Sequence, residues 1–222
     1  ENIDVLALNG NHIVRERLRS TVPDIEQRTR IVEIPNGVCL QAWPFTDRGR
    51  GKNLAFIANL RMVKNPMLLL QCFHKLHQAD GAYRLFVAGS CYDEVLYTYL
   101  QEMVRELDLA DAVSFDGWQG DIGAWLADKH YLISTSVIEG HPFNVLEAMA
   151  CGCKPVLHTF PGARDFFPDE YLFRTVDEFC GRILNDPYEP AAYSRFVEDR
   201  FPLRTYQRRV DELFRQFERD PL

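Results

Sequence analysis

The central segment of the chain, residues 130–158, reads HYLISTSVIEGHPFNVLEAMACGCKPVLH. Two short apolar runs in it, His130–Ser134 and Pro155–His158, are typical of buried strands. Between them, Pro142–Ala150 predicts a helix that begins at a proline and stops before Gly152, two signals that are common at helix starts and ends. The segment therefore predicts a strand, a helix and a second strand in succession.

The same alternation of strands and helices extends outward through most of the chain. Further strands are expected at Ile3–Leu8, Arg30–Ile34, Leu54–Ala58, Tyr83–Ala88 and Ala112–Phe115, and further helices at His12–Arg19, Pro66–Gln78, Asp93–Leu107, Asp121–Leu126 and Leu203–Phe217. Residues 41–52 are expected to form a loop, and residues 159–190 a mixture of short elements. Because the strands are apolar almost throughout, they predict a parallel sheet covered by helices on both faces. The expected fold is a doubly wound α/β domain with a C-terminal helix.

The composition excludes several classes of protein. The 222 residues carry a net charge of −7, which argues against a nucleic-acid partner because phosphate binding needs an excess of Lys and Arg. No apolar run approaches the roughly 20 residues of a membrane span. The six cysteines are too few and too irregular for a disulfide framework, so we expect free thiols in a cytoplasmic protein. The chain opens at Glu1 without an initiator Met or a signal peptide, and we expect it to be a piece of a longer protein.

In a doubly wound fold, ligands bind beyond the carboxyl ends of the strands, near the point where the strand order reverses. The segments expected at that edge are residues 59–65, 89–92, 116–119 and 135–147. Two of them, 59–65 and 135–147, carry residue types that suit a ligand with phosphate groups.

The segment 135–147 runs into the helix expected at Pro142. Free amides and the helix dipole make a helix start an anion site, and the first turn here contains no carboxylate that could neutralise it. Glu139 precedes the helix and Glu147 lies further inside it, so the two carboxylates could accept hydrogen bonds from sugar hydroxyls at either end of a nucleotide diphosphate ligand. The alternative is that Glu139 is a turn residue and Glu147 an exposed helix residue.

A cationic stretch surrounds the strand expected at Leu54–Ala58. Its cations are Arg48, Arg50, Lys52, Arg61 and Lys64, against the single acid Asp47. Arg61 and Lys64 lie just past the strand, where cations can hold a diphosphate and stabilise it as it leaves. The other three are interpreted as a solvated basic loop.

Several motifs resemble those of one enzyme family. They are Ile34-Pro35-Asn36-Gly37-Val38, Ala58-Asn59-Leu60 through Lys64-Asn65, Val87-Ala88-Gly89-Ser90, Val113-Ser114-Phe115-Asp116-Gly117, and the Glu139–Glu147 segment with Pro155-Val156. In this order, they make the stretch from Ile34 to Phe166 similar to the C-terminal donor-binding domain of retaining GT-B glycosyltransferases of family 4, the glycosyl transferases group 1. The resemblance implies a Rossmann-like half of a GT-B fold.

The resemblance also implies a role for each matching residue. Glu139 would face the donor sugar and Lys64 the diphosphate, as the catalytic residues, and Glu147 would hold the ribose. The other substrate-binding positions would be Arg61, Asn59, Gly140, His141, Pro142, Phe143, Asn144, Gly89, Ser90, Gly117 and Trp118. Among them, the backbone of residues 140–144 would hold the β-phosphate region, and residues 115–118 would border the base. The family usually has Arg where this chain has Asn59, and Arg61 could supply the missing cation.

No cofactor is expected beyond the nucleotide-sugar donor itself, and no Asp-x-Asp occurs in the chain, which agrees with metal-independent transfer. By resemblance, residues 1–30 would be the remnant of an N-terminal acceptor domain, 31–200 the donor domain, and 201–222 a helix packing back toward the N-terminal domain. That domain would bind the acceptor, a sugar or a lipid-linked glycan, and make any peripheral membrane contact, so this chain alone is expected to transfer little sugar. The alternatives are a catalytically silent nucleotide-binding or interaction module, and a GT-B sugar-nucleotide epimerase or a phosphorylase.

Overall fold

The computed structural model describes the main chain of residues 3–219 and the side chains of residues 3–216. Its main sheet has six parallel strands in the order β5-β4-β3-β6-β7-β8. These strands are β3 (Asn53–Ile57), β4 (Arg84–Ala88), β5 (Val113–Gly117), β6 (Tyr131–Ser134), β7 (Lys154–His158) and β8 (Leu172–Phe173). A separate parallel pair joins β1 (Val5–Leu8) to β2 (Arg30–Glu33). The doubly wound parallel sheet is therefore confirmed.

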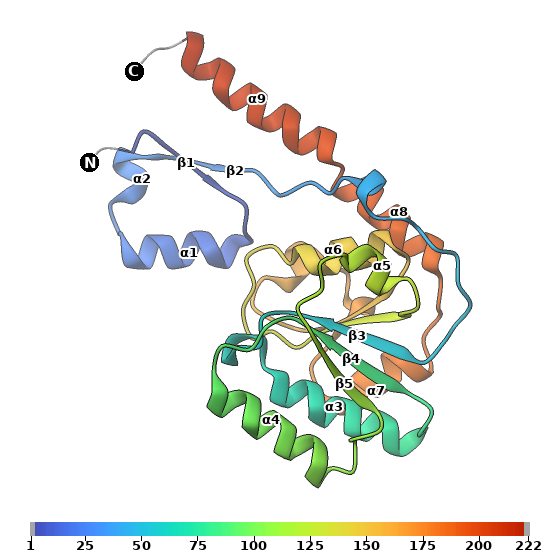
Figure 1. Ribbon diagram of the computed structural model, residues 1–222. Coiled ribbons are helices and arrows are strands. Elements are labelled where there is room, and N and C mark those ends of the chain that lie inside the picture. Colours follow the sequence, from blue (N-terminus) through green and yellow to red (C-terminus); the bar gives the residue numbers. More distant parts are fainter. Residues whose placement is uncertain (1–2, 220–222) are drawn as a thin grey trace.

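Helices cover both faces of the main sheet (Figure 1). The helices are α1 (His12–Thr21), α2 (Ile25–Arg28), α3 (Pro66–Ala79), α4 (Glu94–Glu106), α5 (Ile122–Leu126), α6 (Phe143–Ala150), α7 (Val176–Leu184), α8 (Pro190–Arg200) and α9 (Leu203–Arg219). On one face, Leu54 and Phe56 of β3 belong to a core with α3, α4 and α7. On the other face, Ala55 belongs to a core with α5, α6 and α8. This alternation within one strand is what buries β3 on both sides.

The small β1–β2 sheet lies to one side of the main sheet, together with α1 and α2 (Figure 1). The chain then passes Val38, whose amide donates to the Phe201 carbonyl (2.8 Å) and whose carbonyl accepts from the Leu203 amide (3.2 Å). These bonds join the segment that follows β2 to the start of α9. The division of the chain at residues 30 and 200 stays a prediction. The side chain of Phe217, the predicted last residue of the C-terminal helix, lies outside the described side chains.

The helices α7 and α8 were not predicted. Gly181 lies inside α7, where glycine is unfavourable. The signal that favours α7 is its cap, since Thr175 Oγ1 accepts the Glu178 amide at 3.2 Å. On α8, the buried Tyr193 and Val197 lie one turn apart within a sequence that is otherwise mostly polar.

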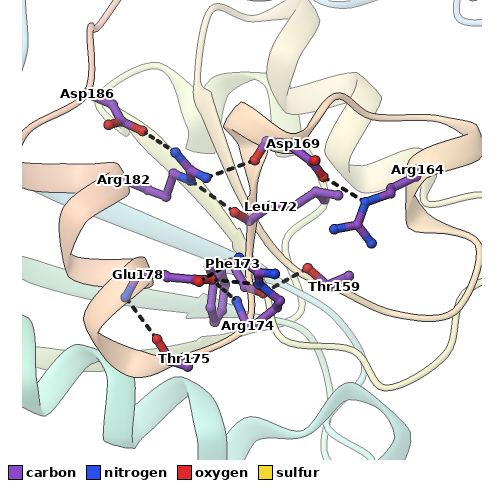
Figure 2. A network of polar contacts seen from close by, with 10 residues as sticks. All are labelled: Thr159, Arg164, Asp169, Leu172, Phe173, Arg174, Thr175, Glu178, Arg182 and Asp186. Atoms are coloured by element: carbon purple, nitrogen blue, oxygen red, sulfur yellow. Dashed lines mark hydrogen bonds and ion pairs between the residues drawn. The ribbon is translucent and has the colours of Figure 1, made fainter.

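A polar network attaches the two-residue strand β8 to its neighbours (Figure 2). The Arg182 guanidinium on α7 donates to the carbonyls of Leu172 and Asp169, both at 3.0 Å, and pairs with Asp186. The Phe173 carbonyl accepts from the Thr159 hydroxyl at 3.1 Å. These bonds hold a strand that is too short to be stabilised by its ladder alone.

Arg50 and Lys52 are exposed, as expected for a solvated loop, but that interpretation is wrong for Arg48. The half-buried Arg48 guanidinium donates to the carbonyls of Leu126 (2.7 Å) and Cys151 (2.6 Å), and also to that of Lys129. Arg50 donates to the carbonyls of Leu184, at the end of α7, and Asp186, and Lys52 pairs with Asp80 at 2.6 Å. These cations therefore attach the loop to the domain and are not available to a ligand. The acceptors of Arg48 and Arg50 are main-chain carbonyls, which no local sequence pattern indicates, and the acceptor of Lys52 is the Asp80 carboxylate.

All six cysteines are free, and Cys72, Cys151 and Cys153 are buried. Of the described helices, none combines the length and the hydrophobicity that crossing a bilayer would require.

At the carboxyl ends of β3, β4 and β5, the backbone leaves no room for a side chain at Gly89. This residue has φ +131°, and a Cβ there would lie 2.0 Å from the Ala58 carbonyl oxygen. Its amide donates to the Gly117 carbonyl at 2.7 Å, which brings the ends of β4 and β5 together.

Replacing Gly89 with Ala should lower the free energy of unfolding by about 2 kcal/mol or more, because the side chain meets both strain at positive φ and a backbone oxygen. Chemical denaturation measures this loss. Gly120→Ala is the matched control, since nothing lies within 4 Å of a Cβ placed there. Equal stability of Gly89→Ala and the wild type would show that β3 and β4 do not approach this closely.

Candidate functional site

The carboxyl edge between β3 and β6 is the point where the strand order reverses. After β3 the chain proceeds to β4 on one side, and β6 lies on the other side, so the segments that follow β3 and β6 separate there. The two segments are nevertheless bonded to each other. The Val137 amide donates to the Val63 carbonyl at 3.0 Å, and Thr135 Oγ1 lies 2.9 Å from the carbonyl oxygens of both Lys64 and Asn65. The two segments singled out in the sequence thus form one surface.

The charged centre of this surface is an ion pair between Lys64 and Glu139. The Lys64 Nζ lies 2.5 Å from Glu139 Oε1, and the same oxygen accepts the Ser136 hydroxyl at 2.6 Å. The exposed fractions of the two side chains are 25% for Lys64 and 12% for Glu139. The short 3-10 turn Met62–Lys64 positions the lysine. The next residue, Asn65, adopts the left-handed conformation at φ 50° and caps α3, because its side chain accepts the Leu68 amide. The structure therefore brings both sequence candidates together, and their direct contact was not predicted.

The start of α6 lies beside this ion pair in the chain and has no internal cap. Pro142, expected as the first helical residue, is instead the N-cap residue, so α6 begins one position later at Phe143, and Pro142 makes no side-chain cap. The first turn contains no acidic residue. Within the described part of the chain, the amides of Gly140, Phe143 and Asn144 donate to no acceptor. Free amides at a helix start attract anions.

The Asn144 side chain is occupied elsewhere in the structure. Its Nδ2 donates to the Ile57 carbonyl at the end of β3, at 2.7 Å. This bond fixes the first turn of α6 against the central strand. Asn144 can therefore offer a ligand its main-chain N–H, while one hydrogen of its side-chain amide is held by β3.

Glu147 lies further along α6 and is half-buried. Its carboxylate has no ion pair or hydrogen bond to any of the described residues, and burial raises its pKa. A half-buried carboxylate without a partner loses water contacts and gains nothing in return, unless a ligand supplies hydroxyl donors. The interpretation of Glu147 as an exposed helix residue does not fit this position.

The remaining candidates follow β3, β4 and β5. Asn59 and Arg61 are exposed, and neither forms an ion pair or a side-chain hydrogen bond with the part of the chain that is described. The Leu60 amide donates to the Ser90 carbonyl at 2.8 Å, which places Ser90 beside the segment that leads to Lys64. Gly117 ends β5, and the Trp118 side chain after it is 72% exposed.

His141 packs into an aromatic cluster. Its ring centroid lies 4.7 Å from that of Phe166 and 5.3 Å from that of Phe201. Both ring nitrogens are buried without a hydrogen-bond partner in the described chain, and burial lowers the pKa of His141 to about 4. The neutral imidazole therefore acts here as a packing side chain, and any contact of His141 with a substrate stays a prediction.

Among the large exposed apolar side chains around the site, the sequence pointed to Trp118 and Phe143, whereas Met62, Tyr92 and Val137 were missed. Large exposed apolar residues follow successive strands, namely Met62 after β3, Tyr92 after β4, Trp118 after β5, and Val137 and Phe143 after β6. Exposed apolar side chains that gather at one edge are typical of a binding surface. Their position in the short segments after strands was the available signal.

Comparison with known proteins identifies the family of the chain. The family described as "Glycosyl transferases group 1" matches residues 44–199. The chain belongs to this family. The family resemblance inferred from the Glu139–Glu147 segment is confirmed at this level.

Two curated proteins are similar to parts of this group 1 chain. The glycosyltransferase 1 domain-containing protein 1 of Xenopus tropicalis is 27% identical over 137 residues, which are 59% of this chain and 39% of that protein. The tRNA-queuosine alpha-mannosyltransferase of Drosophila melanogaster is 25% identical over 123 residues, 55% of this chain and 32% of that protein. The chain thus spans well under half the length of either relative.

Solved structures share the fold of this group 1 chain. Anabaena HepE in complex with UDP-glucose has a TM-score of 0.81 at 16% identity, covering 96% of this chain and 64% of that one. Staphylococcus aureus TarM has a TM-score of 0.77 at 19% identity in a complex that contains UDP, covering 90% of this chain and 42% of that one. A glycosyltransferase from Rickettsia africae has a TM-score of 0.79 at 15% identity, covering 98% of this chain and 64% of that one. The expected GT-B half is thereby confirmed as the fold.

Stability should depend on pH through His141. Because its pKa in the folded protein, about 4, lies below the 6.5 of an ordinary histidine, the unfolded chain takes up the proton first as the pH falls. Stability is therefore lost from about pH 6.5 down to about pH 4. His141→Phe should reduce the fall in unfolding free energy between pH 7 and pH 5 by about 1 kcal/mol, a figure discounted for partial exposure.

Urea denaturation at the two pH values measures this effect. His74→Gln is the matched control for removing a histidine, because α3 packs on the face of the sheet opposite to Phe166 and Phe201. If His141→Phe and the wild type lose the same stability on acidification, His141 does not titrate as a buried group.

Proposed function

We propose that the chain is the donor-binding part of a retaining glycosyltransferase of family 4, and that it binds a nucleoside diphosphate sugar at the carboxyl edge of β3 and β6. The observation that carries the proposal is the uncapped start of α6 beside Lys64 and Glu139. A diphosphate matches the free amides and the lysine, and the remainder of a nucleotide-sugar matches the carboxylates and the exposed apolar side chains.

The chemistry follows from where charge develops. When the bond between the sugar and the diphosphate breaks, its electron pair stays with the diphosphate, and positive charge builds on the sugar. The α6 amides and Lys64 would stabilise the first charge, and Glu139 the second. Retention of the anomeric configuration belongs to the same proposal.

The ion pair between Lys64 and Glu139 would separate when the donor binds. Lys64 would turn to the diphosphate, while Glu139 would keep the Ser136 hydroxyl and face the sugar. The pair thus holds each charge near its place of action while the site is empty. Because 25% of the Lys64 side chain is exposed, this movement needs no unfolding of the core.

The ribose and the base would lie along α6 and β5. Glu147, half-buried and without a partner among the described residues, would accept hydrogen bonds from the ribose hydroxyls. Gly117 and the exposed Trp118 would border the base, with Gly89 and Ser90 at the end of the adjacent strand. The solved complexes of HepE with UDP-glucose and of TarM with UDP make a UDP-sugar the first donor to test.

Asn59 stands where the family has Arg, so the diphosphate would meet one cation fewer. Arg61, two residues after Asn59, is exposed and has no acidic partner in the described chain. It would supply the second positive charge for the diphosphate. The same substitution favours the second candidate function, a nucleotide-binding module without transferase activity.

The rest of the enzyme is also part of this proposal. Residues 1–30, 31–200 and 201–222 would be the remnant of an acceptor domain, the donor domain and a helix that returns toward the acceptor domain. The acceptor domain would bind a sugar or a lipid-linked glycan and make any contact with a membrane. Transfer would need no metal ion, and the free cysteines favour a cytoplasmic location.

Calorimetric titration with UDP, GDP and UDP-glucose tests the proposal. The wild-type chain should bind at least one nucleoside diphosphate, and Lys64→Met should weaken that binding about tenfold, since it removes a charge-assisted hydrogen bond. Lys75→Met, which removes an exposed lysine paired with Asp177, is the matched control. Absence of heat with every nucleotide, for this chain and for a longer protein that contains it, would contradict the proposal.

Glu147 gives a separate test of the ribose site. Glu147→Ala should weaken nucleotide binding by about 1.5–3 kcal/mol, the range for hydrogen bonds to charged groups. Glu106→Ala, on the exposed end of α4, should bind like the wild type. Unchanged affinity of the Glu147 variant would mean that another carboxylate holds the ribose.

A further inference from the structure

The first helix of the chain reaches the candidate donor site through one buried side chain. Asn11, the N-cap residue of α1, is only 5% exposed. Its Oδ1 accepts the Val14 amide at 3.3 Å, which is the ordinary role of a cap. Its Nδ2 donates to the carbonyl of Glu139 at 3.1 Å and to that of Pro161 at 3.2 Å. Both amide hydrogens therefore serve contacts outside α1, and one of these joins residues 128 positions apart.

The surroundings of Asn11 are shaped to admit it. Gly162 has φ +83°, and a Cβ at this position would lie 2.4 Å from the Asn11 side chain. Only glycine combines that backbone conformation with that free space. The glycine after Pro161 thus leaves room for the Asn11 side chain, so the contact depends on the residue type at both positions.

The bond to Glu139 determines the direction of the next amide. The Glu139 carbonyl and the Gly140 N–H belong to one planar trans peptide, in which the two groups point in opposite directions. Because Asn11 holds the carbonyl, the Gly140 N–H points away from α1. That N–H has no acceptor in the described part of the chain, and it belongs to the group of free amides before α6.

We infer that Asn11 is a positioning residue for the donor site: by holding the Glu139 carbonyl, it aims the Gly140 amide at the β-phosphate of a bound nucleotide. This inference rests on the proposed function. Asn11 touches no substrate, and its effect passes through one peptide group. It follows that α1, which belongs to the small-sheet part of the chain, influences phosphate binding at the edge of the main sheet.

A neighbouring contact supplies a matched control. His12 also joins α1 to the loop after β7, because its Nδ1 lies 2.6 Å from Asp165 Oδ2 and its amide donates to the same oxygen at 3.0 Å. Loss of the His12 ring weakens the attachment of α1 without changing the bond to Glu139. His12→Ala therefore separates a general loosening of α1 from a loss of the specific peptide orientation.

The experiment compares nucleoside diphosphate with nucleoside monophosphate binding. UDP and UMP, or GDP and GMP if guanine nucleotides bind the wild type better, differ only in the β-phosphate. Asn11→Ser keeps a good helix cap and removes both amide donors. It should weaken diphosphate binding about tenfold and monophosphate binding less than twofold.

A second variant tests whether an acceptor in place of the amide donors weakens diphosphate binding further. Asn11→Asp also keeps the cap of α1 but turns an acceptor oxygen toward two carbonyls, so it should lose more diphosphate affinity than Asn11→Ser. His12→Ala should keep the wild-type ratio of the two affinities. Thermal melts of each variant identify those that are folded under the conditions of the titration.

The outcomes distinguish this inference from the proposed function. If the wild type binds diphosphate and both folded Asn11 variants keep its diphosphate-to-monophosphate ratio, the inference is overturned and the proposed function stands. The inference is also overturned if His12→Ala lowers the ratio as much as Asn11→Ser does. If the wild type binds neither nucleotide, the proposed function fails and this inference fails with it.

Discussion

The structure depends on which partners hydrogen-bond the main-chain N–H and C=O groups where β3 and β6 end. The two strands are neighbours, but the segments that follow them separate, and their polar groups need partners there. Thr135, Val137 and Asn144 supply bonds between these segments and the end of β3. The amides before and at the start of α6 are left without an acceptor in the described chain, and this is the physical origin of the candidate site.

The Lys64–Glu139 pair follows from the same constraint. A partly buried ion pair adds little stability on balance, because the loss of hydration offsets much of the attraction between the charges. Its value here is chemical: a cation and an anion are both held next to a set of free amides. Glu139 pairs with the lysine and accepts the Ser136 hydroxyl, and in the proposed function Ser136 would keep the carboxylate in place when Lys64 turns to the diphosphate.

Much of the fold could be predicted from local patterns. The predicted strand Leu54–Ala58 and the observed Asn53–Ile57 differ by one residue at each end, because an apolar run flanked by polar residues fixes a buried strand. The predictions failed where tertiary contacts override local signals, as for the Arg48 guanidinium on three carbonyls and for α7 with its internal Gly181. In the site, the segments 59–65 and 135–147 were found from the rule for strand ends. The contact between Lys64 and Glu139, 75 positions apart, and that between Asn11 and the Glu139 carbonyl depend on how distant segments meet, which one sequence does not encode locally.

A crystal structure of the chain soaked with UDP tests the central claim most directly. The account predicts phosphate oxygens on the amides of residues 140–144, with Lys64 Nζ turned from Glu139 toward the diphosphate and Glu147 on the ribose. A nucleotide bound elsewhere, for example beside Arg200 and Arg209 in the 210 Å³ pocket between Pro35 and α9, with the Lys64–Glu139 pair intact, would contradict it.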